Sequence, residues 1–199
     1  MGAAESVEER KSIKAWRCSV CGEVTLSAKR PSECAFCGAD SAYIDVAEDV
    51  PADLNHLQGA PLDERDRENL EASLAAELAD SERYFSMAAE IGKNPECIWQ
   101  QAMFKRLARV EAEHASIFSK LLSSSSEWHS AVGTAGSSGR STTGDVTKAH
   151  AESIAGEEAA SGRYSEYARG AHAERLAYVW CALAAVEQTH HWLLAGKVN

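Results

Sequence analysis

The chain has 199 residues, a formal net charge of −10 and an isoelectric point near 5.2. This length holds one ordinary domain and a small module, and since no Lys/Arg cluster offsets the acidic charge, nucleic acid is excluded as a partner. The chain lacks an export signal and a run of about 18 apolar residues, so we expect a soluble, cytoplasmic protein without a membrane partner.

The first 63 residues divide into three parts by composition. Residues 1–12 are small and charged without an apolar period, which predicts a disordered tail. Residues 13–48 are punctuated by Gly22, Pro31 and Gly38, which is typical of a compact, turn-rich module. Residues 49–63 combine two prolines and a glycine with polar residues and are predicted to be a linker.

The module carries two Cys-x-x-Cys-Gly loops, and they predict one tetrahedral metal site. The four thiolate ligands would be Cys18, Cys21, Cys34 and Cys37. Zinc and iron both suit four sulfurs, and zinc is slightly favoured on these residues alone. A zinc site would only fold the module, whereas iron would also let it pass one electron. The remaining cysteines, Cys97 and Cys181, are predicted to be small buried apolar residues.

Residues 64–199 are predicted to form a four-helix bundle, so the protein as a whole is mostly α. Ala, Glu, Ser and Leu dominate the composition and only four prolines occur. Apolar residues at three- and four-residue spacing predict helices over residues 64–91, 95–122, 145–169 and 171–195. The long Ser/Gly-rich stretch between the second and third helices allows a crossover connection, as in ferritin-like bundles.

The helices carry carboxylates and histidines in the pattern of a two-metal site. A Glu-x-x-His pair lies on one helix face, and the second and fourth helices each supply one, while the first and third each supply a further Glu. The predicted ligands are Glu77, Glu111, His114, Glu157, Glu187 and His190. Such ligands suit iron or manganese. The alternative is four amphipathic helices with solvated charges.

The two halves of the bundle also repeat a tyrosine. Tyr84 follows Glu77 by seven residues, and Tyr164 follows Glu157 by the same interval. Seven residues are about two helical turns, so each tyrosine is predicted to lie on the face of its own carboxylate.

With these motifs the chain resembles the rubrerythrin family of the ferritin-like superfamily over nearly everything after residue 12. The cysteine module looks like a short rubredoxin placed before the bundle. The resemblance implies one iron in the module and two irons in the bundle, with zinc as the alternative in the module and manganese or zinc in the bundle. It also implies bridging roles for Glu111 and Glu187, terminal ligation by Glu77 and Glu157, and nitrogen ligation by His114 and His190.

One departure from the family pattern concerns a further carboxylate. The family usually places it three residues after the third-helix Glu, where this chain has Ala160, and usually has a small residue at the equivalent first-helix position, where this chain has Asp80. We hypothesise that Asp80 partly replaces the missing carboxylate and that His114 stays a ligand in both redox states. Glu158 is expected to lie on the surface.

The resemblance implies an enzyme that reduces hydrogen peroxide to water with electrons passed from the module. Tyr84 matches a tyrosine of the family, and we expect Tyr84, Tyr164 and Asp80 to be further catalytic residues. The alternatives are a ferroxidase or dioxygen-reducing protein and a non-catalytic zinc-binding protein. An electron-donor protein or reductase is expected as a partner. Because a helix of 25 residues spans about 38 Å, the module is expected to lie too far from its own chain's bundle site. We therefore expect a homodimer with the module over the partner's bundle.

Overall fold

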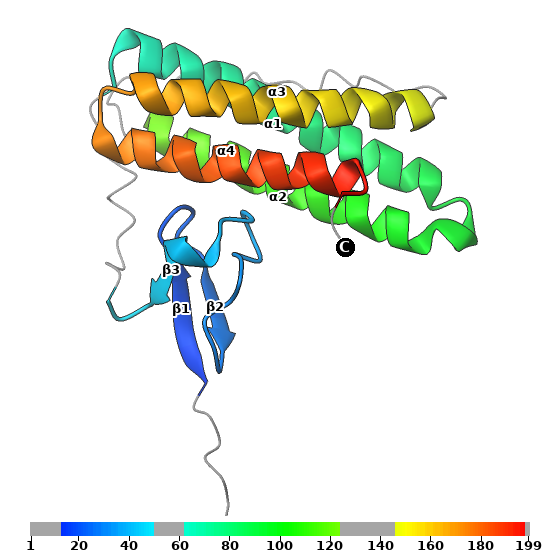
Figure 1. The fold of residues 1–199 in the computed structure, drawn as a ribbon, viewed down its shortest axis with the longest axis horizontal. Coiled ribbons are helices and arrows are strands. Elements are labelled where there is room, and N and C mark those ends of the chain that lie inside the picture. Colours follow the sequence, from blue (N-terminus) through cyan, green and yellow to red (C-terminus); the bar gives the residue numbers. More distant parts are fainter. Residues whose placement is uncertain (1–12, 50–61, 124–145, 198–199) are drawn as a thin grey trace, which may run out of the picture.

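The computed structural model describes residues 13–49, 62–123 and 146–197. A small sheet module near the N-terminus lies beside a bundle of long helices, against α2 and α4 (Figure 1). The predicted fold class, a ferritin-like bundle with a rubredoxin-like module, is confirmed. The predicted tail, most of the linker and the long connection fall outside the described residues. Within the described segments, every helix is too short or too polar to cross a bilayer.

The module is a three-stranded antiparallel sheet with strand order β2-β1-β3. Its elements are β1 (Lys14–Cys18), β2 (Val24–Ser27), the short helix η1 (Ser41–Tyr43) and β3 (Ile44–Val46). Trp16 in the central strand pairs with Thr25 on one side and Val46 on the other. The sheet ends at Cys18, so it delivers the first metal-binding loop to the end of the module that faces the bundle.

The bundle consists of two helical hairpins, α1 with α2 and α3 with α4. Its helices are α1 (Glu64–Ile91), α2 (Ile98–Ser123), α3 (Val146–Gly170) and α4 (Glu174–Leu194), with a short helix η3 (Pro95–Cys97) before α2. Two apolar clusters fill the interior. One contains Phe118, Tyr164 and Trp180, and the other contains Tyr84 and Phe104.

Two helices begin later than predicted, one because of a local cap and the other because of a contact with α1. The side chain of Asn94 caps a single turn that starts at Pro95, and the α-helix begins only after that turn. At the other hairpin, the backbone N–H of His172 donates to Asp66 Oδ2 at 3.1 Å. This bond holds the turn between α3 and α4 against the start of α1, so α4 begins at Glu174.

The expectation that both spare cysteines are buried is wrong. Cys97 is half-buried in the turn before α2, and Cys181 is exposed on α4. Cys181 lines an open surface groove between α3 and α4, where the small neighbours Ser161 and Ala184 leave its sulfur uncovered.

The module packs directly on the bundle of its own chain. The rings of Tyr43 and Tyr178 meet edge to face at 5.0 Å, and Ser19 Oγ lies 2.8 Å from Tyr178 Oη. Buried residues of the module and of the bundle form one continuous apolar cluster. The expectation that the module lies too far from its own chain's bundle site is therefore wrong, because the module packs across the middle of the bundle instead of at its end. The homodimer stays a prediction.

Candidate metal centres

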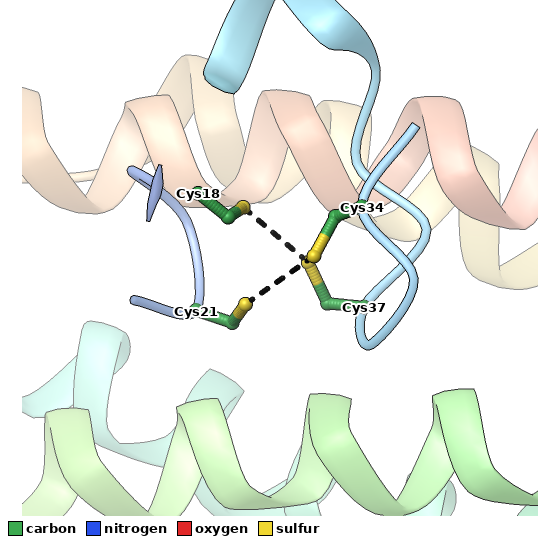
Figure 2. A group of neighbouring side chains, drawn as sticks. All are labelled: Cys18, Cys21, Cys34 and Cys37. Atoms are coloured by element: carbon green, nitrogen blue, oxygen red, sulfur yellow. Dashed lines mark hydrogen bonds between the residues drawn. The ribbon is translucent and has the colours of Figure 1, made fainter. Parts of the chain in front are cut away.

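The four module cysteines converge on one point. All four are buried, and their sulfurs point toward one another (Figure 2). The sulfurs of Cys18 and Cys37 are 3.8 Å apart, and those of Cys21 and Cys34 are 3.7 Å apart. A tetrahedral metal with metal–sulfur bonds of about 2.3 Å requires sulfurs about 3.8 Å apart. The cysteine cluster thus fits one zinc or iron ion without rearrangement.

The two cysteine loops close in the same way. Gly22 N donates to Cys18 O at 2.8 Å, and Gly38 N donates to Cys34 O at 3.0 Å. Both glycines have positive φ angles, of 87° and 75°, which residues with a Cβ adopt only at a cost. The glycines in the motif are therefore required by the backbone turn that brings each pair of thiols together.

Without a metal, some of the four cysteines hold a proton and others are thiolates. Interaction with the Cys18 thiol raises the pKa of Cys21 and of Cys37 and lowers the pKa of Cys34. Metal binding requires all four groups as thiolates, so it must release the protons that Cys21 and Cys37 hold. Metal affinity should therefore rise with pH.

The helical carboxylates and histidines form two overlapping donor groups. In each group the ligand atoms lie within 4.8 Å of one another, and every residue is buried. Glu111 and Glu187 belong to both groups, so the two groups share a pair of carboxylates that can bridge two cations. The first group is completed by Glu77 and His114, and the second by Glu157 and His190. The structure thus brings together all six residues predicted as bundle ligands.

Each histidine presents Nδ1 to the shared carboxylates. His114 Nδ1 is 3.0 Å from an oxygen of Glu111 and 3.0 Å from an oxygen of Glu187. His190 Nδ1 is 3.0 Å from the other oxygen of Glu111 and 3.2 Å from the other oxygen of Glu187. The two rings are nearly parallel, with centroids 6.0 Å apart. Each bridging carboxylate therefore turns one oxygen toward each histidine.

The bundle site contains buried polar atoms that lie close together without aligned hydrogen bonds. Both oxygens of Glu111, Oε1 of Glu187 and Nδ1 of His114 are buried, and their contacts of 3.0 Å do not have hydrogen-bond geometry. Such groups cost free energy unless they coordinate a metal or bind a proton. Four glutamates neutralise two divalent cations, so this donor set fits two metal ions of the iron, manganese or zinc class.

The pKa shifts in the metal-free site also show that its carboxylates need compensating positive charge. Burial raises the pKa of Glu77 to about 8, with the charge of Glu187 adding to the effect. Burial also opposes a charge on His114, but Glu187 and Glu111 outweigh it and raise the pKa of His114 well above its usual range. Without cations, protons must therefore supply the compensating positive charge.

The two tyrosines are paired across the bundle. Tyr84 on α1 donates a hydrogen bond to Glu157 on α3, and Tyr164 on α3 donates one to Glu77 on α1. Burial raises the pKa of both phenols, so they stay protonated and act as donors. The sequence repeat predicted each tyrosine near the carboxylate of its own helix. It could not reveal the crossed pairing, which depends on how α1 and α3 face one another.

A second symmetric pair was not predicted. Ser81 Oγ donates to Ala108 O at 2.8 Å, and Ser161 Oγ donates to Ala184 O at 2.9 Å. The serines lie four residues after Glu77 and Glu157, and the two carbonyls lie three residues before Glu111 and Glu187. These bonds fasten α1 to α2 and α3 to α4, and the repeated Glu-x-x-x-Ser spacing could have indicated them.

Asp80 does not join either donor group. Its carboxylate forms an ion pair with Arg83 one turn later on α1. The structure therefore gives no support to Asp80 as a replacement ligand. Ala160 is buried at the position where the family has its further carboxylate, and Glu158 is exposed, as expected.

A hydrogen bond connects the two candidate centres. His114 Nε2 lies 3.0 Å from the backbone oxygen of Cys37, and both residues are buried. A carbonyl oxygen only accepts, so Nε2 carries the hydrogen, which leaves the lone pair of a neutral ring on Nδ1 for a metal. The residues are 77 positions apart, and nothing in the sequence indicated the contact.

Comparison with known proteins shows similarity to the rubrerythrin family. Residues 68–138 match the rubrerythrin family model. The chain is also 31% identical over 116 residues to reverse rubrerythrin-1 of Clostridium acetobutylicum, and the match covers 55% of this chain and 62% of the relative. The chain thus spans less than two thirds of the relative's length. No solved structure gives a significant match.

Proposed function

We propose, from the match of residues 68–138 to the rubrerythrin family model and the similarity to reverse rubrerythrin-1, that this chain is a di-iron oxidoreductase that reduces hydrogen peroxide to water. The observation that carries the proposal is the hydrogen bond between Cys37 O and His114 Nε2. It joins a site suited to one-electron transfer to a site suited to two cations within one chain. A purely structural zinc module would not need this contact.

Iron in the bundle would supply two electrons to the O–O bond, and iron in the module would replace them one at a time. The overall reaction consumes one peroxide, two electrons and two protons and yields two waters. Cys18, Cys21, Cys34 and Cys37 would hold the module iron. Glu77, Glu111, His114, Glu157, Glu187 and His190 would hold the bundle irons.

The side chains around the bundle site fix the orientation of the ligands. Tyr84 and Tyr164 hold the terminal glutamates through hydrogen bonds from their buried hydroxyls. A carboxylate that accepts such a bond keeps one oxygen directed away from the metals and the other toward them. The N–H of His114 is bound to Cys37, so this ring keeps one tautomer and one orientation.

A rapid-mixing experiment tests the proposal. The iron-loaded protein is reduced anaerobically and mixed with hydrogen peroxide or with dioxygen, and the visible absorption of the ferric thiolate is followed. We expect peroxide to restore this absorption faster than dioxygen does. Glu187→Gln should slow that response at least tenfold while the module keeps its colour, because this residue contributes to both bundle donor groups.

A ferroxidase or dioxygen-reducing function is the second candidate, and Ala160 is the observation that favours it. Without a further carboxylate there, the donor groups contain only four glutamates and two histidines. Faster oxidation by dioxygen than by peroxide in the same experiment would select this candidate. A colourless protein loaded with zinc would instead favour the non-catalytic alternative. An electron-donor partner and a homodimer remain part of the proposal.

A further inference from the structure

A groove lies at the junction of the cysteine module and α2. It has a volume of about 500 Å³. The module contributes Glu33 and Ala35, which flank Cys34 in the second cysteine loop. The α2 helix contributes Ala102, Lys105, Arg106, Arg109 and Val110. The groove therefore opens beside the candidate iron of the module, on the face of α2 that carries the module.

Three exposed cations line this groove, although the chain as a whole is strongly acidic, with a net charge of −10. Arg106 forms an ion pair with Glu33, the acidic residue of the lining, and so ties α2 to the cysteine loop. Neither Lys105 nor Arg109 forms an ion pair with a residue in the described segments. Two uncompensated positive charges thus face solvent next to Cys34.

Exposed aromatic side chains border the same region. Phe36, between Cys34 and Cys37, is 41% exposed, and Trp99 is 83% exposed. Trp99 lies one turn before Ala102 on α2, so it continues the side of the helix that lines the groove. Aromatic residues together with arginine are enriched at protein interfaces. The combination indicates a surface for a protein partner.

We infer that this basic groove docks an acidic protein that carries one electron and delivers it to the module iron. The inference rests on the proposed function, because only an iron module needs such a donor. In the step, one electron leaves the reduced centre of the carrier and the module iron goes from ferric to ferrous. Two deliveries restore the electrons consumed by one peroxide. A single iron accepts one electron, so a donor of hydride, which carries two, does not fit this step.

Charge complementarity gives the expected behaviour of the complex. A basic patch steers an acidic partner and raises its association rate by about 10-fold to 1000-fold, and the effect falls as salt rises. Redox partners form small, short-lived interfaces, which agrees with a groove rather than a broad apolar face. A basic carrier of the same size would be repelled.

The test uses a flavodoxin as the acidic carrier and cytochrome c as the basic control. Binding to the full-length, zinc-loaded protein is measured at low and at high salt, so that no electron transfer is needed. The double variant Lys105→Glu/Arg109→Glu should bind flavodoxin at least tenfold more weakly than the unaltered protein. The double variant Lys148→Glu/Arg169→Glu makes the same charge change on α3, in the layer away from the module (Figure 1), and should have no effect.

The iron-loaded protein separates this inference from the proposed function. Reduced flavodoxin should reduce the module iron more slowly in the double variant. Peroxide should oxidise both proteins equally once dithionite has reduced them fully. Absent or charge-independent flavodoxin binding, with the peroxide reaction intact, overturns the docking inference. Charge-dependent binding without any peroxide reaction supports the docking surface and rejects the proposed function alone.

Discussion

Substitution of Gly38 by Ala tests how the module is seated on the bundle. A Cβ at this position would lie 2.9 Å from Val186 Cγ1 and 3.8 Å from Val110 Cγ1, and the backbone has a φ angle of +75°. The left-handed conformation costs about 1–2 kcal/mol for a residue with a Cβ. The close contact with α4 adds about 1–3 kcal/mol of overpacking. We therefore expect Gly38→Ala to lower the free energy of unfolding by about 2–5 kcal/mol, measured by denaturant titration of the zinc-loaded protein.

Two further variants separate the contributions to this loss. Gly196 also has a positive φ angle, +66°, but nothing lies within 4 Å of its added Cβ, so Gly196→Ala reports backbone strain alone. Val186→Ala removes the methyl group that a Cβ added at Gly38 would strike, and in the double variant it should recover about 1–3 kcal/mol as coupling energy. In the iron-loaded protein, reoxidation of the module by peroxide should slow in Gly38→Ala and recover in the double variant. Equal losses for Gly38→Ala and Gly196→Ala, or no coupling with Val186, would refute this account of docking.

Three shorter predictions concern the bundle site. Tyr84→Phe removes the donor to Glu157 and should weaken metal binding about 10-fold to 100-fold in a chelator competition. Tyr167 lies on α3 and packs its ring against Trp180, so Tyr167→Phe should not weaken metal binding. The raised pKa of Glu77, about 8, means that the folded metal-free protein holds a proton which the unfolded chain releases at lower pH. The free energy of unfolding of the metal-free protein should therefore fall as pH rises from about 4.5 to about 8, and Glu77→Gln should make this fall smaller. The affinity of the site for metal should rise over the same pH range. Asp80→Asn should leave two metal ions per bundle by elemental analysis, and loss of one ion would make Asp80 a ligand.

The sequence predicted the fold class because its signals are local. Two Cys-x-x-Cys-Gly loops and apolar residues at helical spacing need no knowledge of the tertiary structure. The α1 helix begins and ends at the predicted residues because Asp63 caps its first turn and Gly92 ends it. The start of α4 could not be predicted in this way, because Asp66 of α1 holds the turn before α4.

The contacts between elements could not be predicted in the same way. Glu77 and Tyr164 belong to different hairpins, and their hydrogen bond depends on the packing of α1 against α3. The module can pack against α2 and α4 only because Gly38 has no side chain. In the sequence, however, this glycine is already explained by the tight turn of the cysteine motif. One residue can therefore satisfy a local and a tertiary requirement, and the sequence displays only the first.

The docked module also makes an otherwise symmetric site asymmetric. The two helical hairpins place equivalent ligands around the shared carboxylates, with His114 corresponding to His190. Of these two histidines, only His114 is hydrogen-bonded to a described residue of the module, through the carbonyl of Cys37. A hydrogen bond to a carbonyl makes an imidazole a stronger donor to a metal. If iron fills both positions, as proposed, the position beside His114 should therefore bind its ion more tightly and receive electrons first.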